Sequence, residues 1–253
     1  MESKAAIIRE KGTNGEREMA YMLYLAGFDV KDVTMTDLVS GRETLEDINM
    51  VVYCGGFSNS DVLGSAKGWA GSFLFNPKAK AALDNFYARE DTLSLGVCNG
   101  CQLMMELGLI TPEDKKKGKM LHNDSHKFES AFLGVTVPMN RSVMFGSLSG
   151  SKLGIWVAHG EGKFSLPYPE DHYNVVLKYS YDEYPGNPNG SDYSVAGIAS
   201  QDGRHLAMMP HLERACFPWE NAYYPLDRKD NDQITPWMEA FVNARKWVEA
   251  HKK

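Results

Sequence analysis

Short apolar runs alternate with helix-like stretches along the first 110 residues, and this alternation restricts the possible folds more than any other feature of the sequence. Each run has the length and composition of a buried strand. Strands that alternate with helices predict an open, mainly parallel α/β sheet with flanking helices and right-handed crossovers. The expected strands are "KAAIIRE", "INMVVYCGG" and "TLSLGV", and the expected helices span residues 14–28 and 77–90. The first helix is expected to bury Met19, Met22, Leu23 and Leu25.

The second half of the chain, from about residue 120, consists of shorter β-rich pieces separated by turn clusters. These pieces are expected to continue the same sheet and to add a small antiparallel β layer. They are "LGVTVPM", "SVMFG", "GIWVAHG", "NVVLKYS", "SVAGIAS" and "HLAMMPH". An amphipathic helix closes the chain, with Trp237, Phe241 and Trp247 as expected packing residues.

Length and charge exclude several classes of protein. The 253 residues can bury a large core and are expected to form one domain over 1–253. The net charge is −6 and the lysines are scattered, so no basic stripe indicates a nucleic-acid partner. No apolar run approaches the roughly 20 residues of a membrane span, and residues 1–4 lead directly into "AAII" without a signal-like pattern. A cytoplasmic protein that binds neither nucleic acid nor membrane is expected.

One of the four cysteines stands in a segment with the spacing of a nucleophile elbow. Without a secretory signal, four cysteines are not expected to form a disulfide framework. The segment Gly96-Val97-Cys98-Asn99-Gly100 joins a predicted strand to a predicted helix, and its glycines permit a sharp turn that exposes the nucleophile. The start of the next helix favours a thiolate and offers free N–H groups. From this segment alone, a small buried cysteine is the alternative.

Two further segments add candidate site residues. Gly55 and Gly56 follow another predicted strand, and such a turn can direct backbone amides toward one point, as an oxyanion hole requires. The carboxyl ends of parallel strands meet at one sheet edge, so both turns are expected there. His211 and Glu213 follow the run "HLAMMP", and residues two apart in an extended chain face the same side. They are therefore candidates for the base and orienting carboxylate that a cysteine nucleophile needs.

Taken together, these segments resemble the class I, or triad, glutamine amidotransferases, and within them the glutaminase domains of phosphoribosylformylglycinamidine synthases of the large single-chain type. The matching stretches follow the family's order over almost the whole chain, and as a set they are more specific than the elbow alone. They are "CGGFSNSDVLGSAKGWA", "GVCNGCQLM", "HNDSHKFES", "VAHGEGKF", "YPGNPNGS", "MMPHLER" and "PWMEAFVNARKW". The resemblance implies the flavodoxin-like fold of class I amidotransferases.

The resemblance also implies roles for individual residues. Cys98 is the expected nucleophile, and His211 and Glu213 complete the catalytic triad. His159 in "AHGEGKF" is expected to support the site, because the family's base is the later histidine. The backbone amides of Gly56 and Asn99 are expected to form the oxyanion hole, and Gly55, Phe57 and Gln102 to contact the substrate.

Three positions depart from the family pattern and leave the triad itself intact. Asn59, Ser60 and Leu212 stand where the family has tyrosine, glycine and proline. They lie beside the expected oxyanion loop and the triad, so they bear on the fine geometry of the site and on its rate.

The implied reaction is hydrolysis of L-glutamine through a cysteinyl thioester. The ammonia would serve an ATP-dependent synthase domain or subunit that converts formylglycinamide ribonucleotide to its amidine in purine biosynthesis. The chain has no G-x-x-x-x-G-K-[ST] motif, so ATP and Mg²⁺ are expected in the partner domain and no cofactor or metal in this one. The closing "PWMEAFVNARKW" resembles the large single-chain form, so the chain is expected to be the C-terminal part of a longer synthase. The alternative is a free-standing glutaminase subunit.

Three other functions fit parts of the sequence. The first is a class I amidotransferase with another acceptor. The second is a cysteine peptidase or related hydrolase of similar fold, against which Gln102 and the flanking motifs argue. The third is an inactive binding module, against which the intact triad argues.

Several other patterns predict ordinary structure. His122 and His126 are four apart but lack the ligand pattern of a zinc site, so a polar loop is expected. "EYPGNPNGSD" is expected to be a turn, with a contact to the partner domain as the alternative. Cys54, Cys101 and Cys216 are expected to be structural.

Overall fold

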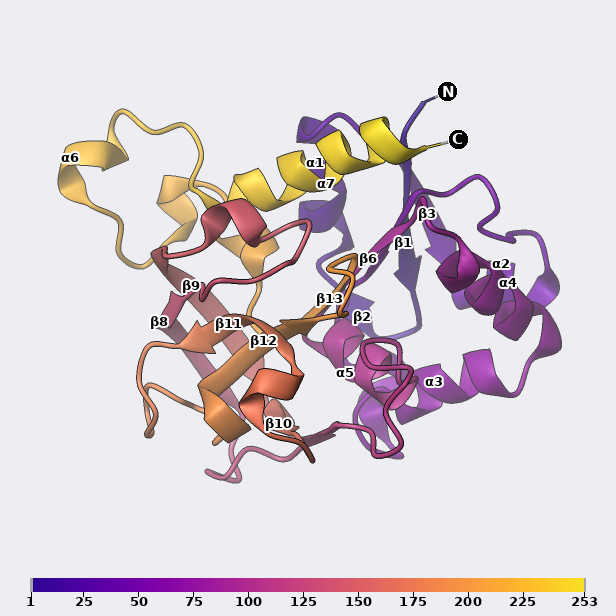
Figure 1. Cartoon of the computed structure of the whole chain (residues 1–253), viewed down its shortest axis with the longest axis horizontal. Coiled ribbons are helices and arrows are strands. Elements are labelled where there is room, and N and C mark those ends of the chain that lie inside the picture. Colours follow the sequence, from indigo (N-terminus) through magenta and orange to yellow (C-terminus); the bar gives the residue numbers. More distant parts are fainter. Residues whose placement is uncertain (1, 253) are drawn as a thin grey trace.

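A nine-stranded sheet forms the centre of the molecule in the computed structural model, which describes residues 2–252 (Figure 1). The parallel half of the sheet consists, in spatial order, of β3 (Asp29–Thr34), β1 (Lys4–Arg9), β4 (Met50–Tyr53), β6 (Leu93–Val97) and β13 (His205–Met208). The antiparallel half continues with β12 (Val195–Ala199), β11 (Asn174–Tyr179), β8 (Glu129–Thr136) and β9 (Lys152–His159). The predicted mainly parallel sheet with added antiparallel strands is confirmed.

Helices pack on the parallel half in two groups. One group consists of α1 (Glu16–Leu25), which packs on β1 and β3, and α7 (Trp237–His251), which packs on α1. In the other, α5 (Asn99–Glu106) packs on β4, β6 and β13, followed by α3 (Lys67–Leu74), α4 (Pro77–Ala88) and α2 (Met35–Ser40). The two groups lie on opposite sides of the parallel strands, and the short α6 (Leu226–Lys229) stands apart from both (Figure 1).

Two short antiparallel ladders lie outside the main sheet. The pair β2 (Thr13–Asn14) and β5 (Gly55–Gly56) joins the segment after β1 to the turn after β4. The pair β7 (Lys119–Leu121) and β10 (Lys163–Ser165) joins the segment before β8 to the segment after β9. The first ladder matters for the site, because it fixes the backbone of the glycine-rich turn 55–56.

Two expectations about the elements are wrong. Leu25 is 42% exposed, whereas Met19, Met22 and Leu23 are buried as expected. Leu25 is the last residue of α1 and points to solvent just before the chain returns to the sheet as β3. The "SVMFG" segment forms turns and leads into a 3-10 helix at Gly146–Leu148 instead of a strand. Its apolar residues Met144 and Phe145 are nevertheless buried, because they fill the core from a turn rather than from the sheet.

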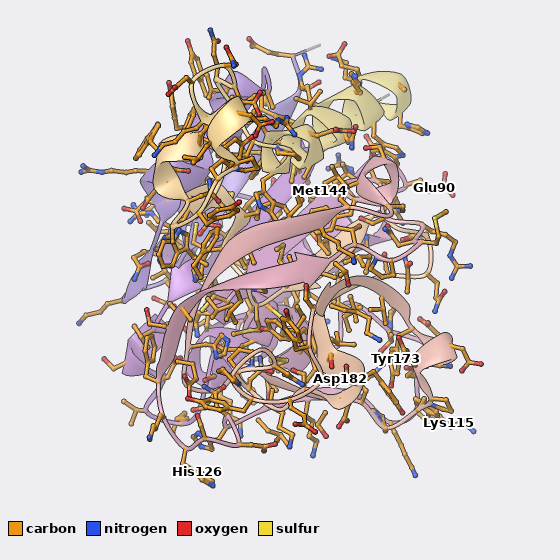
Figure 2. All side chains as sticks on the ribbon, turned by 90° about the vertical axis from the view of Figure 1, so that its left-hand side faces the viewer. Glu90, Lys115, His126, Met144, Tyr173 and Asp182 are labelled. Atoms are coloured by element: carbon orange, nitrogen blue, oxygen red, sulfur yellow. The ribbon has the colours of Figure 1, made fainter. Side chains whose placement is uncertain are left out.

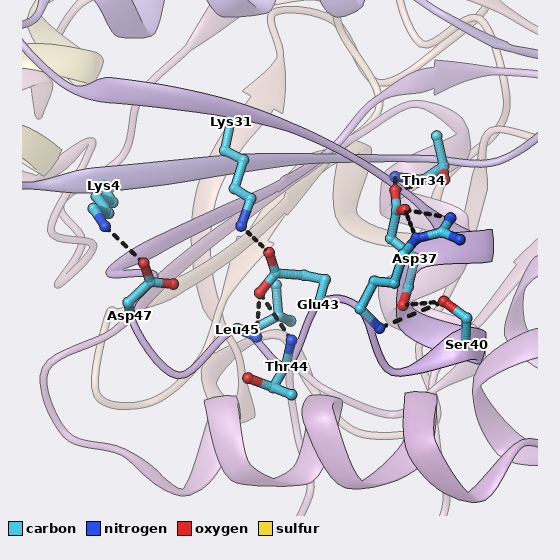
Figure 3. Close-up of polar contacts among 10 residues, drawn as sticks. Lys4, Lys31, Thr34, Asp37, Ser40, Glu43, Thr44, Leu45 and Asp47 are labelled. Atoms are coloured by element: carbon cyan, nitrogen blue, oxygen red, sulfur yellow. Dashed lines mark hydrogen bonds and ion pairs between the residues drawn. The ribbon is translucent and has the colours of Figure 1, made fainter.

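Charged side chains stabilise the edge of the sheet at β3. The Asp37 carboxylate accepts hydrogen bonds from Thr34, which form the capping box of α2, and from Arg42. These hydrogen bonds lower the pKa of Asp37 to about 2. Beside it, Glu43 accepts hydrogen bonds from two backbone amides and forms an ion pair with Lys31 (Figure 3). The edge strand β3 is itself rich in charged residues, which disfavour pairing with another chain.

The ends of the expected domain, Met1 and Lys253, lie outside the described residues. Between them, no helix has both the length and the apolar character that crossing a membrane requires.

Candidate active site

Cys98 stands at the tight joint between β6 and α5. Its backbone has φ 53° and ψ −108°, a conformation that a residue with a side chain rarely adopts. A Cβ atom on Gly100 would lie 2.0 Å from the carbonyl oxygen of Tyr53, and one on Gly96 would lie 2.5 Å from the carbonyl oxygen of Gly100. Only glycine at both positions lets α5 start this close to the sheet. The glycines of the predicted elbow are therefore required by packing.

The turn after β4 brings a second glycine against the same point. A Cβ atom on Gly55 would lie 2.9 Å from Cε1 of His211 and 3.3 Å from Cβ of Cys98. Gly56 has φ +116°, and a Cβ atom there would lie 2.6 Å from Cα of Thr13 across the β2–β5 ladder. Three segments that are distant in sequence therefore meet at the carboxyl edge of the sheet, as expected for an open α/β fold.

His211 and Glu213 form a buried pair beside the cysteine. The Nδ1 atom of His211 lies 2.7 Å from Oε1 of Glu213, and both residues are 2% exposed. Burial alone would lower the pKa of His211. The Glu213 charge and the hydrogen bond with the Cys98 side chain outweigh burial and raise this pKa to about 10. The imidazolium form is thus favoured near neutral pH, with one ring nitrogen oriented by a carboxylate and the ring within reach of the thiol.

The sulfur of Cys98 is more enclosed than the sequence predicted. The expectation of an exposed nucleophile is wrong, because Cys98 is only 5% exposed and its Sγ lies 3.5 Å from the carbonyl oxygen of Ala158. Ala158 stands at the end of β9, and the backbone pairing of Trp156 with His211 holds that strand over the elbow. The antiparallel half of the sheet thus covers the thiol.

The other three cysteines lie in the interior. Burial is the main cause of a raised pKa for the thiols of Cys54, Cys101 and Cys216. All four cysteines are free. A thiol whose pKa is raised by burial is a poor nucleophile, which fits the structural role expected for these three.

The expected oxyanion and substrate residues surround the elbow. Asn99 is the first residue of α5, so its backbone N–H has no acceptor within the helix. Gly55 and Gln102 are buried, and Phe57 is 51% exposed at the outer side of the turn. Both ends of the Gln102 amide are engaged, since its nitrogen donates to the carbonyl of Glu161 and its oxygen accepts from the Asn99 side chain. Gln102 thus joins α5 to the loop that follows β9.

Comparison with known proteins identifies the family. Residues 2–248 match the family model of the CobB/CobQ-like glutamine amidotransferase domain. The chain belongs to this amidotransferase family.

Relatives of this amidotransferase chain are much longer proteins. It is 44% identical over 98% of its length to the "Probable phosphoribosylformylglycinamidine synthase, chloroplastic/mitochondrial" of Arabidopsis thaliana. It is also 44% identical over 97% of its length to the human phosphoribosylformylglycinamidine synthase. The chain spans only 19% and 20% of the length of these two proteins.

Solved structures of amidotransferase type have the same fold. PurLQS of Thermotoga maritima superposes over 100% of both chains with a TM-score of 0.71 and 25% identity. A glutamine amidotransferase, also from Thermotoga maritima, superposes over 98% of this chain and 99% of its own with a TM-score of 0.57. Its identity of 16% indicates a shared fold only.

Two polar loops support the amidotransferase site through asparagines that were not predicted as site residues. The buried side chain of Asn123 donates to the carbonyl of His159 and accepts from the backbone N–H of Gly162. Asn189, buried in the "YPGNPNGS" loop, donates to the carbonyl of Gly162. That loop consists of turns and bends, as expected, and its Asn189 also stabilises the segment after β9. The sequence signal that could have indicated these supporting residues is the presence of asparagines inside glycine-rich and histidine-rich motifs.

His159 is part of this support. Its Nδ1 lies 3.1 Å from Oδ1 of Asn123, while its Nε2 is buried and has no hydrogen-bond partner within residues 2–252. Burial, with the neighbouring charge of His211, lowers the pKa of His159 to about 4. A neutral imidazole held by Asn123 fits the expected supporting role rather than that of the base.

His122 and His126 lie in the exposed loop that precedes β8. His126 projects outward at the rim of the molecule (Figure 2). Within residues 2–252, no group of three or more His, Cys, Asp or Glu side chains is placed to bind a metal ion.

Proposed function

We propose that this chain is the glutaminase part of a phosphoribosylformylglycinamidine synthase and forms the C-terminal part of that enzyme. In this role it hydrolyses L-glutamine and supplies ammonia for the ATP-dependent conversion of formylglycinamide ribonucleotide to formylglycinamidine ribonucleotide. The identity to two such synthases over nearly the whole chain supports this assignment. ATP and Mg²⁺ would be bound by the synthase part.

The observation on which the proposal depends most is the contact of Gly55 with both candidate catalytic side chains. Because Gly55 has no side chain, Cys98 and His211 can lie next to each other, although they are 113 positions apart in the chain. Glu213 then orients the imidazole from its other side. This is the order of nucleophile, base and carboxylate that acyl transfer by a cysteine requires.

In the proposed first step, the Cys98 thiolate attacks the side-chain amide carbon of glutamine. The oxygen of the tetrahedral intermediate becomes negative, and the backbone N–H groups of Gly56 and Asn99 would stabilise it without rearrangement. His211 then donates a proton to the departing nitrogen, which leaves as ammonia. The raised pKa of His211 suits this step, because the imidazole already holds the proton when the thiol is ionised.

In the second step, His211 accepts a proton from water as the water attacks the γ-glutamyl thioester. Glutamate leaves, and the thiolate and imidazolium form again. The Glu213 carboxylate stabilises the imidazolium in both steps through the bond at Nδ1.

The proposal includes a cytoplasmic location, on the evidence of the composition of the chain. The name of the Arabidopsis thaliana relative gives a chloroplastic or mitochondrial location for that protein, so an organellar enzyme is the alternative.

The test compares two nitrogen sources in the enzyme that contains both glutaminase and synthase parts. Cys98→Ala should lower glutamine-dependent formation of the amidine by about 10⁴-fold and leave ammonia-dependent formation unchanged. The matched control is Cys101→Ala, which removes a buried thiol from the helix that follows Cys98 and should leave both activities near wild type. Retained glutamine use in Cys98→Ala, or equal loss with both nitrogen sources, would contradict the proposal.

A further inference from the structure

The loop after Gly56 has an unusual backbone. Asn59, Ser60 and Asp61 are consecutive residues with φ of 51°, 56° and 46°, and Ala66 has φ 57°. Residues with side chains rarely adopt this left-handed conformation, and each costs free energy unless the surrounding structure compensates for it. The loop 58–66 therefore needs contacts that hold it, and it lies directly beside the expected oxyanion glycine.

Backbone hydrogen bonds supply some of these contacts, such as that from the N–H of Asn59 to the carbonyl of Lys11, and the side chain of Asp61 supplies others. Its Oδ1 accepts a hydrogen bond of 2.9 Å from the backbone N–H of Ala66, which closes the loop on itself. Both of its oxygens lie 3.2 Å from Nδ2 of Asn99, at the start of α5. The Ser58 hydroxyl adds a longer contact of 3.4 Å to Oδ1. One carboxylate thus connects the strained loop to the helix that follows the nucleophile.

The Asn99 side chain also connects α5 to the start of the loop. Its Oδ1 accepts a hydrogen bond of 2.9 Å from the backbone N–H of Ser58, two residues after Gly56. Its Nδ2 donates to Asp61 and to Oε1 of Gln102. Because a carboxylate can only accept hydrogen bonds, the end of the Asn99 amide that faces Asp61 must be the Nδ2 group. The amide oxygen must then face Ser58.

We propose that Asp61 is a positioning residue for the oxyanion hole, which it assembles by fixing the Asn99 amide between loop 58–66 and α5. The two expected oxyanion donors, Gly56 and Asn99, belong to different segments of the chain. The hydrogen bond from Ser58 to the Asn99 side chain sets the distance between these segments, and Asp61 sets the orientation of that side chain. This inference rests on the proposed function, because it presupposes that both amides stabilise an oxyanion.

The test uses Asp61→Ala and Asp61→Asn in the enzyme that contains both parts. Asp61→Ala should lower kcat for glutamine hydrolysis by about tenfold or more and change KM by no more than about threefold, since misplaced donors affect the transition state most. Asp61→Asn retains one acceptor oxygen and should fall between Asp61→Ala and wild type. Asp84→Asn, in an exposed ion pair with Lys80, is the control and should leave kcat unchanged.

Two further readouts separate positioning from a general structural role. Alkylation of Cys98 by iodoacetamide needs no oxyanion hole, so its rate should stay near wild type in both Asp61 variants. Ammonia-dependent synthesis should also stay unchanged. An unchanged kcat in Asp61→Ala, or a fall in kcat matched by an equal fall in Cys98 alkylation, would overturn the inference. Failure of the proposed function would differ, because the wild-type enzyme itself would release no glutamate from glutamine.

Discussion

Two glycine-containing turns meet at the site, and they are held in place by different means. The turn around Cys98 is fixed by the backbone, since Gly96 and Gly100 bring α5 into direct contact with the sheet. The turn after β4 begins in the same way, at Gly55 and Gly56, but continues as loop 58–66, whose backbone N–H groups donate in part to side-chain oxygens. The candidate nucleophile is thus held by steric packing, whereas the loop that follows the expected oxyanion glycine is held by a polar network. The two turns should respond to mutation in different ways.

The largest effect is expected where the backbone packing is tightest. Gly100→Ala would place a Cβ atom 2.0 Å from the carbonyl oxygen of Tyr53, so α5 and β4 would have to move apart. The free energy of unfolding should fall by about 3 kcal/mol or more, at or above the upper range for overpacked cores. Glutaminase activity should be lost with it. Chemical denaturation measures the first effect and glutamate release the second.

The control for this prediction is another helical glycine. Gly71→Ala in α3 would bring a Cβ atom no nearer than 3.7 Å to the Phe75 ring. It should be neutral or stabilise the protein by up to about 1 kcal/mol, as expected for alanine in a helix. Equal destabilisation by both variants would show that the elbow is not specially packed.

A smaller effect is expected where hydrogen bonds hold the chain. Asn123→Ala would leave the buried carbonyl of His159 and the buried N–H of Gly162 without their present partner. The free energy of unfolding should fall by about 2–3 kcal/mol, and KM for glutamine should rise because the segment after β9 borders the nucleophile. Asn231→Ala removes an exposed local bond and should change neither quantity. A wild-type KM in Asn123→Ala would mean that this loop does not support the site.

The smallest effect is expected from relief of backbone strain. Ser60 has φ 56°, at a position where the family pattern has glycine, so Ser60→Gly should stabilise the protein by at most about 1 kcal/mol. The greater freedom of glycine in the unfolded chain offsets part of the gain. Ser130→Gly, in the regular strand β8, should instead destabilise the protein slightly. Thermal unfolding of the two variants measures this difference, and destabilisation by Ser60→Gly would contradict it.

The elbow, the alternation of strands and helices and the pair His211–Glu213 could be predicted because each depends on residues close together in sequence. The glycine spacing around Cys98 and the two-residue separation of the pair are local patterns with a direct geometric meaning. Most strands of the large sheet were also predictable, since they are short apolar runs, but the charged edge strand β3 was not predicted. The predicted helix 77–90 likewise corresponds to α4 at Pro77–Ala88, which Asn76 caps.

The enclosure of the sulfur and the polar network could not be predicted, because both depend on contacts between distant segments. Ala158 reaches Cys98 only because β9 pairs through Trp156 with His211. Asp61 and Asn99 are separated by 38 positions, and no local pattern indicates their hydrogen bond. The prediction of a strand at "SVMFG" was wrong, because the apolar residues of this segment enter the core from a turn and not from the sheet.

The most direct test of the account is to map the cysteine that a glutamine-like alkylating agent modifies. A chloroketone analogue of glutamine should label Cys98 alone, and excess glutamine should protect it, because the candidate base and oxyanion donors surround only this thiol. Cys54, Cys101 and Cys216 should remain unlabelled, since burial raises the pKa of each thiol. A label on any of these three in the folded protein, or no protection of Cys98 by glutamine, would contradict the assignment of Cys98 as the nucleophile.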